Sequence, residues 1–149
     1  MGDRAQASVE FLMVLGLGMV ILLPATLLFY QYSQNSNDEL KFGQLTRIGN
    51  DITNQAEKVY YYSDPSKIEI EGIMPSDVYN LTLQTDWPNK VNIITFWIRS
   101  GGKNQSFPFL SRVNINGTFS PRAFSAGKKR ISLEVKKTGN TPYVEIRFL

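Results

Sequence analysis

An uncharged run of 20 residues near the N-terminus constrains this chain more than any other feature of its sequence. It extends from Phe11 to Tyr30 and reads FLMVLGLGMVILLPATLLFY. A helix rises about 1.5 Å per residue, so this run spans the roughly 30 Å hydrocarbon core of a bilayer. Because every backbone amide in that layer needs an internal partner, we expect a helix. Pro24 removes one helical donor and is expected to kink or loosen the helix near residues 20 to 24.

Three interpretations of the run compete. A cleaved secretory signal usually has an apolar region of about 7 to 15 residues, followed by small residues at the cleavage site. Here the run continues through Phe29 and Tyr30 into polar sequence without such a site, which disfavours this interpretation. A plain single-span anchor agrees with hydropathy alone. The third interpretation depends on the residues that precede the run.

Those residues read MGDRAQASVE, so Glu10 stands directly before the first residue of the run. A carboxylate at this place is unusual, because burying it costs several kcal/mol unless it is paired or lies at the interface. One explanation is an interfacial Glu10 near a helix N-terminus, where the macrodipole favours it, with Ser8 as the N-cap.

A second explanation is a resemblance. Gln6, Ser8 and Glu10 form a Gln-x-Ser-x-Glu pattern at the start of a hydrophobic helix, which resembles the class III signal peptide of archaeal type IV-like prepilins. The family pattern continues with three residues and then Leu, whereas this chain has Val14 there and Leu15 next to it. The leader is also short and carries a single cation.

The resemblance covers about residues 4 to 30, and the rest of the chain adds no motif of its own. It implies that a prepilin peptidase cuts between Ala5 and Gln6, which leaves the apolar helix on the mature protein. It also implies a pilin, a subunit of an extracellular filament for surface adhesion. Its partners would be further copies of itself in a helical homopolymer, a pilus assembly ATPase and a membrane platform. Before assembly the single-pass chain would lie in membrane lipid with its head outside the cell.

In related bacterial pilins the early Glu neutralises the new N-terminal amine of a neighbouring subunit. The resemblance therefore implies that Glu10 pairs with the amine of Gln6 in the filament. Such a pair would compensate the charge of Glu10 in the filament, whereas lipid cannot compensate it. Alternatively, Glu10 serves only in peptidase recognition, together with Ala5, Gln6 and Ser8.

After the run, apolar residues recur at spacings of 3 or 4, which indicates one face of an amphipathic helix: Leu45, Ile48, Ile52, Ala56 and Val59. We expect this face to pack on a following sheet. Asp64-Pro65 is expected to end the helix. Ser33 to Asn37 and Gly43 are poor helix formers and are expected to fray or bend it between the membrane span and the stalk. The predicted organisation is a leader (1-5), a helix (6-63, with 11-30 in the membrane and 31-63 as an amphipathic stalk) and a β-rich head (64-149).

From Lys67 onward the hydrophobic period changes to two, which predicts strands. Six are expected, with a possible short one at Ser106 to Leu110: around Ile68 to Ile73, Val78 to Leu83, Val91 to Ile98, Arg112 to Asn116, Arg130 to Val135 and Pro142 to Phe148. The most apolar of these, Val91 to Ile98, is expected at the centre of a sheet. Gly101-Gly102, Asn116-Gly117 and Gly139-Asn140 are turn signals. The predicted fold class is α+β: a long apolar helix with an antiparallel β-sandwich-like head of six or seven strands.

The composition argues against an enzyme. Cysteine and histidine are both absent, which removes thiol nucleophiles, the commonest general base and the commonest zinc ligands. No phosphate-binding Gly-rich loop or carboxylate metal loop is present, so we expect no catalytic residue, metal or cofactor. The net charge of +3 is spread thinly, and no nucleic acid partner is expected.

Three Asn-x-Ser/Thr sequons occur in the predicted head and are candidate glycosylation sites: Asn80, Asn104 and Asn116. Asn104 and Asn116 lie beside turn signals and are better placed than Asn80, which falls within a predicted strand. Two lysine-rich segments, Lys128-Lys129-Arg130 and Lys136-Lys137, are explained as protection of a strand edge. Tyr60-Tyr61-Tyr62 is expected to pack between helix and sheet.

Two functions from different classes therefore follow from the sequence. The first is the filament subunit that the resemblance implies. The second is a membrane-anchored extracytoplasmic binding module that does not polymerise.

Overall fold

The computed structural model describes residues 2–62, 66–86 and 91–149, with side chains from residue 8 onward. Within these ranges an α+β fold is found, as expected: one long helix, α1 (Gly2–Tyr61), precedes seven strands. The strands are β1 (Lys67–Met74), β2 (Val78–Asp86), β3 (Val91–Ser100), β4 (Lys103–Ser111), β5 (Ile115–Asn116), β6 (Gly127–Thr138) and β7 (Thr141–Phe148). The chain divides into two compact units, Met1–Glu39 and Leu40–Leu149.

The first unit consists of the N-terminal part of α1. Pro24 lies inside this helix, as its sequence position predicts, and Thr26 Oγ1 donates a hydrogen bond to the Leu22 carbonyl at 2.8 Å. Ser33 to Asn37 and Gly43, which were expected to fray or bend the helix, are all helical. The helix ends at Tyr61, and Asp64-Pro65, its predicted stop signal, lies outside the described residues.

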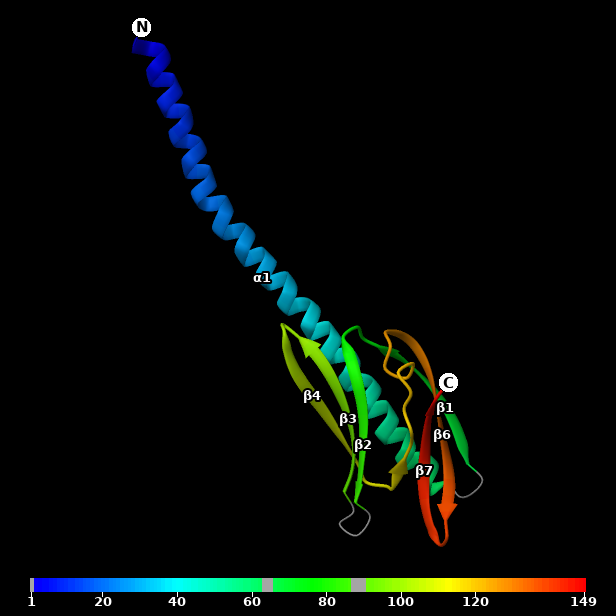
Figure 1. Cartoon of the computed structure of the whole chain (residues 1–149). Coiled ribbons are helices and arrows are strands. Elements are labelled where there is room, and N and C mark those ends of the chain that lie inside the picture. Colours follow the sequence, from blue (N-terminus) through cyan, green and yellow to red (C-terminus); the bar gives the residue numbers. More distant parts are fainter. Residues whose placement is uncertain (1, 63–65, 87–90) are drawn as a thin grey trace. The chain divides into compact units, whose positions relative to one another are not determined.

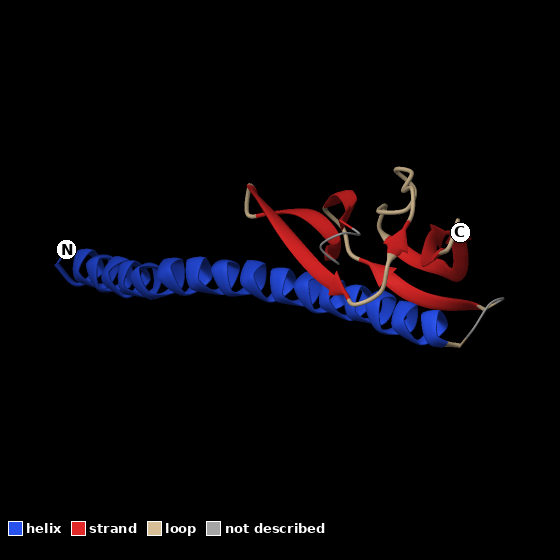
Figure 2. Ribbon diagram, turned by 90° about the horizontal axis from the view of Figure 1, so that it is seen from below, coloured by secondary structure: helices blue, strands red, loops and turns tan. Residues whose placement is uncertain are grey.

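The second unit packs the C-terminal part of α1 against two sheets (Figure 2). The predicted helix face is confirmed, because its five apolar residues are at most 2% exposed: Leu45, Ile48, Ile52, Ala56 and Val59. Two glycines allow the helix to lie close to the strands of both sheets. A Cβ on Gly49 would lie 2.5 Å from the ring of Phe109 in β4, and one on Gly72 in β1 would lie 2.7 Å from Ile48 Cδ1.

One sheet has the strand order β2-β3-β4 (Figure 1) and is antiparallel throughout. The apolar run from Val91 is its central strand β3, as predicted. Alternate residues of β3 point into the core, where Ile94, Phe96 and Ile98 are fully buried. Gly101 and Gly102 turn the chain into β4 with positive φ angles of 55° and 75°, which confirms this turn signal.

The other sheet has the order β1-β6-β7-β5. β6 pairs antiparallel with both β1 and β7, and Gly139 turns β6 into β7 with a φ of 61°. Core residues from this sheet are Ile131, Leu133, Val144 and Ile146, all fully buried against the helix and the opposite sheet.

Two segments differ from the predicted strands. The possible short strand at Ser106 to Leu110 is the nine-residue β4, which tolerates Pro108 because it is an edge strand. The predicted strand Arg112 to Asn116 is confirmed only over its last two residues: Ile115–Asn116 pairs with β7, and it runs parallel to that strand. Val113 and Ile115 both insert into the core, and the carbonyl of the intervening Asn114 accepts a hydrogen bond from the Val144 amide at 2.8 Å.

The Asn116-Gly117 turn signal is wrong, since no turn is formed there. Gly117 is needed for a different reason: a Cβ at this position would lie 2.6 Å from the carbonyl oxygen of Ile146 in β7. The glycine therefore permits close backbone contact instead of a positive φ.

A polar seam joins the two sheets beside β5. The Asn92 side chain is 1% exposed and donates to Asn114 Oδ1 at 3.4 Å, and Asn114 Nδ2 donates to the Pro142 carbonyl at 3.3 Å. Thr85 Oγ1 donates to the Ile115 carbonyl at 3.1 Å. The bond to Asn114 satisfies the buried Nδ2 of Asn92, whereas the buried Oδ1 of Asn92 has no hydrogen-bond partner among the described residues.

Candidate assembly surface and the predicted site residues

The first unit presents an apolar surface that no other described part of the chain covers. The helix is long and apolar enough to cross a membrane, and none of its most apolar window is buried. Seventeen large apolar or aromatic side chains between Val9 and Tyr32 are 47–74% exposed. They are Val9, Phe11, Leu12, Met13, Val14, Leu15, Leu17, Met19, Val20, Ile21, Leu22, Leu23, Leu27, Leu28, Phe29, Tyr30 and Tyr32. A surface of this kind requires either lipid or protein around it.

The predicted peptidase site lies at the start of this helix. The side chains of Ala5 and Gln6 lie outside the described residues. Ser8 and Glu10 are described, and both are exposed on α1. The explanation of Glu10 as an interfacial residue required Ser8 to be the N-cap of the helix. This is wrong, because α1 begins at Gly2 and includes Ser8. Glu10 has no ion-pair partner among the described residues.

The three sequons lie in different settings in the second unit. Asn80 is exposed on edge strand β2, directly after an irregularity in the register, and Asn104 is exposed at the start of edge strand β4. Asn116 is exposed on β5, where its Oδ1 accepts a hydrogen bond from the Gly117 amide at 2.8 Å. Asn80 is therefore more open than its position within a strand indicated.

The lysine-rich segments do not protect a strand edge, because β6 is paired on both sides. They take part in cross-strand ion pairs instead. Lys128 Nζ lies 2.7 Å from Glu71 Oε2, and Lys136 pairs with Glu145 of β7. Burial raises the pKa of Glu145, but hydrogen bonds from Lys136 and Arg147 outweigh this effect and hold the pKa below its ordinary value.

The three tyrosines at the end of α1 differ in their surroundings. Tyr60 packs against the core, as predicted, whereas Tyr61 and Tyr62 are 76% and 71% exposed. The Tyr60 and Tyr61 rings meet edge to face at a centroid distance of 5.5 Å. The expected packing between helix and sheet therefore holds for Tyr60 alone.

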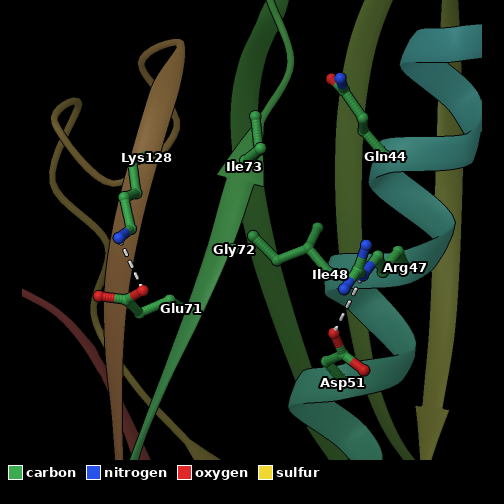
Figure 3. Close-up of a pocket in the computed structure, with 8 residues that line it drawn as sticks. All are labelled: Gln44, Arg47, Ile48, Asp51, Glu71, Gly72, Ile73 and Lys128. Atoms are coloured by element: carbon green, nitrogen blue, oxygen red, sulfur yellow. Dashed lines mark ion pairs between the residues drawn. The ribbon is translucent and has the colours of Figure 1, made fainter.

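A recess that no sequence motif indicated lies in the second unit, between α1 and strands β1 and β6 (Figure 3). Its volume is about 400 Å³, and it is lined by Gln44, Arg47, Ile48, Asp51, Glu71, Gly72, Ile73 and Lys128. Its charged side chains are paired with one another: Arg47 with Asp51 at 4.0 Å, and Lys128 with Glu71 at 2.7 Å. The recess therefore offers an apolar floor with compensated charges.

An ion pair fixes the β1–β2 connection to the helix. Lys41 Nζ donates to Asp77 Oδ2 at 2.8 Å, and the Arg99 amide donates to the Asp77 carbonyl at 3.0 Å. The hydrogen bond from Lys41 is the main reason why the pKa of Asp77 lies below its ordinary value. Asp77 has a φ of 72°, a conformation that Asp and Asn tolerate better than other residues with side chains.

Among the described residues, no cluster of three or more carboxylates, histidines or cysteines could hold a metal ion. Comparison of the chain with protein-family models, with curated proteins and with solved structures found no match.

Proposed function

We propose that this chain is a structural subunit of an archaeal type IV-like pilus that polymerises through its N-terminal helix. The observation that carries the proposal is the exposed apolar surface from Val9 to Tyr32. Removing one large apolar side chain from water contributes about 1.5–3 kcal/mol, so a surface of seventeen such side chains stays in water only at great cost. In a pilus, lipid covers this surface first, and the helices of other subunits cover it after assembly.

Glu10 supports the filament over a permanent anchor. It extends from the same helix, directly beside Phe11, and the described residues hold no cation that pairs with it. A buried carboxylate without a partner is strongly destabilising, so packed apolar helices need a cation at this level. The N-terminal amine of Gln6, released by a prepilin peptidase in a neighbouring subunit, would supply it.

The second unit would then form the outer part of the filament. Its core is complete, because α1 from Leu45 to Val59 closes the two sheets. A head with its own core can fold outside the membrane while the first helix stays in lipid, and it need not refold on assembly. The proposed location is therefore the cell membrane before assembly and the extracellular filament afterwards, where adhesion to surfaces would occur.

Detergent-free shearing of the cells that make the protein tests this function. A pilin is recovered in sheared fibres, and its intact mass begins at Gln6, without Met1 to Ala5. A binding module that is only anchored stays in the membrane fraction and needs detergent for release. A native chain that still begins at Met1, or one that begins near residue 30, would contradict the proposal.

A further inference from the structure

The sheet β2-β3-β4 has a second face, which points away from the core (Figure 1). Along β3 the buried residues alternate with half-buried ones, and Trp97 belongs to the outward set. The register places Asn80 of β2 opposite Trp97 on one side and Ser106 of β4 opposite it on the other. These three side chains therefore form one row across the outer face.

Two of the three sequons meet at this tryptophan. Asn80-Leu81-Thr82 lies on β2, and the indole Nε1 of Trp97 donates a hydrogen bond to Thr82 Oγ1 at 3.0 Å. Asn104-Gln105-Ser106 lies on β4, with its serine opposite Trp97. The hydrogen bond draws the indole toward β2, so Trp97 lies beside the sequon of Asn80.

The backbone also exposes Asn80. The register shifts between Val78 and Asn80, which is an irregularity of the β-bulge type at the edge of the sheet. Leu81, the middle residue of the sequon, is 5% exposed and anchors the strand in the core, while Asn80 and Thr82 point outward. The Asn80 Oδ1 accepts from the Leu81 amide at 2.9 Å, and no hydrogen bond engages its Nδ2 within the part of the chain that the structure describes.

We propose that Asn80 carries an N-linked glycan whose first sugar packs on the indole of Trp97. A sugar ring has an apolar face that suits a half-buried aromatic ring such as that of Trp97, and its hydroxyls suit the neighbouring threonine and serine. In the transfer, Asn80 Nδ2 bonds to the anomeric carbon of a sugar held on a polyprenyl phosphate or diphosphate. The bond between that carbon and the phosphate oxygen breaks, the lipid phosphate leaves with the electron pair, and a base of the transferase takes one amide proton.

This inference rests on the proposed function in one respect: the head must reach the compartment where such a transferase acts. Sheared fibres, or heads that external protease removes from intact cells, are therefore the material to analyse. Trypsin separates the three sequons, because Asn80 falls in Ile68–Lys90, Asn104 in Asn104–Arg112 and Asn116 in Val113–Arg122. We expect the first peptide to carry the added mass of whole sugar residues. An unmodified Ile68–Lys90 from such material would overturn the inference and leave the filament proposal intact.

The packing on Trp97 has its own test in full-length protein that carries Trp87→Phe, so that Trp97 is the single tryptophan. Loss of the glycan through Asn80→Gln should shift Trp97 emission to longer wavelength and raise its quenching by acrylamide. Asn104→Gln, on the same face, is the matched control and should change neither. The Trp87→Phe proteins with and without Asn80→Gln are then made in a host without N-glycosylation, where acrylamide should quench Trp97 equally in both. A difference that persists there, or no difference in the native host, would refute the packing.

Discussion

The contact between Gly49 and Phe109 leads to a prediction in which two opposing effects have known sizes. Gly49 lies in a helix, where Ala is favoured over Gly by about 1 kcal/mol. A Cβ at this position, however, would lie 2.5 Å from three ring carbons of Phe109. This ring is held against Phe96, edge to face at 5.7 Å between centroids. Overpacking of this kind costs about 1–3 kcal/mol, so we expect Gly49→Ala to lower the free energy of unfolding by about 1 kcal/mol.

Gly43 supplies the matched control. It lies on the same helix in the same compact unit, is exposed, and has no atom within 4 Å of the place that a Cβ would take. Gly43→Ala should therefore raise stability by up to about 1 kcal/mol. In a Phe109→Ala background the clash is absent, and Gly49→Ala should become stabilising as well. Urea unfolding of the full chain in mild detergent, followed by near-ultraviolet circular dichroism, measures each of these proteins. Equal stabilisation by Gly49→Ala and Gly43→Ala in the wild-type background would refute the close packing.

Three further predictions concern single charges and hydrogen bonds. Glu10→Gln should spare membrane insertion and cleavage but abolish or disorder filaments in electron micrographs; accumulation of uncut protein would instead assign Glu10 to peptidase recognition, and normal filaments from correctly cut protein would exclude both roles. Asp77→Asn, which keeps a residue suited to the positive φ, should lower stability by less than about 1 kcal/mol near neutral pH, because the Lys41–Asp77 pair is partly exposed. Since the pKa of Asp77 is lowered in the folded state, the ion pair stabilises the fold above the unfolded pKa of about 3.9, and this stabilisation is lost as pH falls through the folded pKa. Equal acid sensitivity of Asp77→Asn and wild type in urea titrations would contradict this. Asn114→Ala should lower the free energy of unfolding by about 1–3 kcal/mol in the same assay, because it leaves the buried Asn92 Nδ2 without its partner. A change within experimental error would show that the polar seam does not stabilise the fold.

Much of the fold could be predicted because the hydrophobic period records which side chains are buried. The spacing from Leu45 to Val59 identified the buried helix face, and the run from Val91 identified the central strand of a sheet. The same signal was only partly right at Arg112 to Asn116, because Val113 and Ile115 are both buried but only Ile115–Asn116 pairs with β7. Burial sets the period, and hydrogen-bonding partners far along the chain decide whether a strand forms.

Partners that are distant in the sequence also explain what was missed at the candidate sites. Lysines on either end of β6 were assigned to a sheet edge, because no local feature shows that β1 and β7 pair on both of its sides. Gly117 resembled a turn residue, yet its role is contact with the backbone of β7. The row of Asn80, Trp97 and Ser106 depends on the register of three strands, which sequence alone does not give.

The absence of cysteine permits a direct measurement of the central claim, that the apolar helix becomes the interior of a polymer. Leu22→Cys places a single thiol on the exposed helix, where Leu22 is 66% exposed in the single chain. Ser125→Cys places one on an exposed loop of the second unit as the control. In sheared, detergent-free material, a water-soluble maleimide should label the loop thiol of the Ser125→Cys protein. The helix thiol of the Leu22→Cys protein should stay unlabelled until denaturant dissociates the subunits. Equal labelling of the two thiols before dissociation, or no protein in the sheared material, would contradict the account.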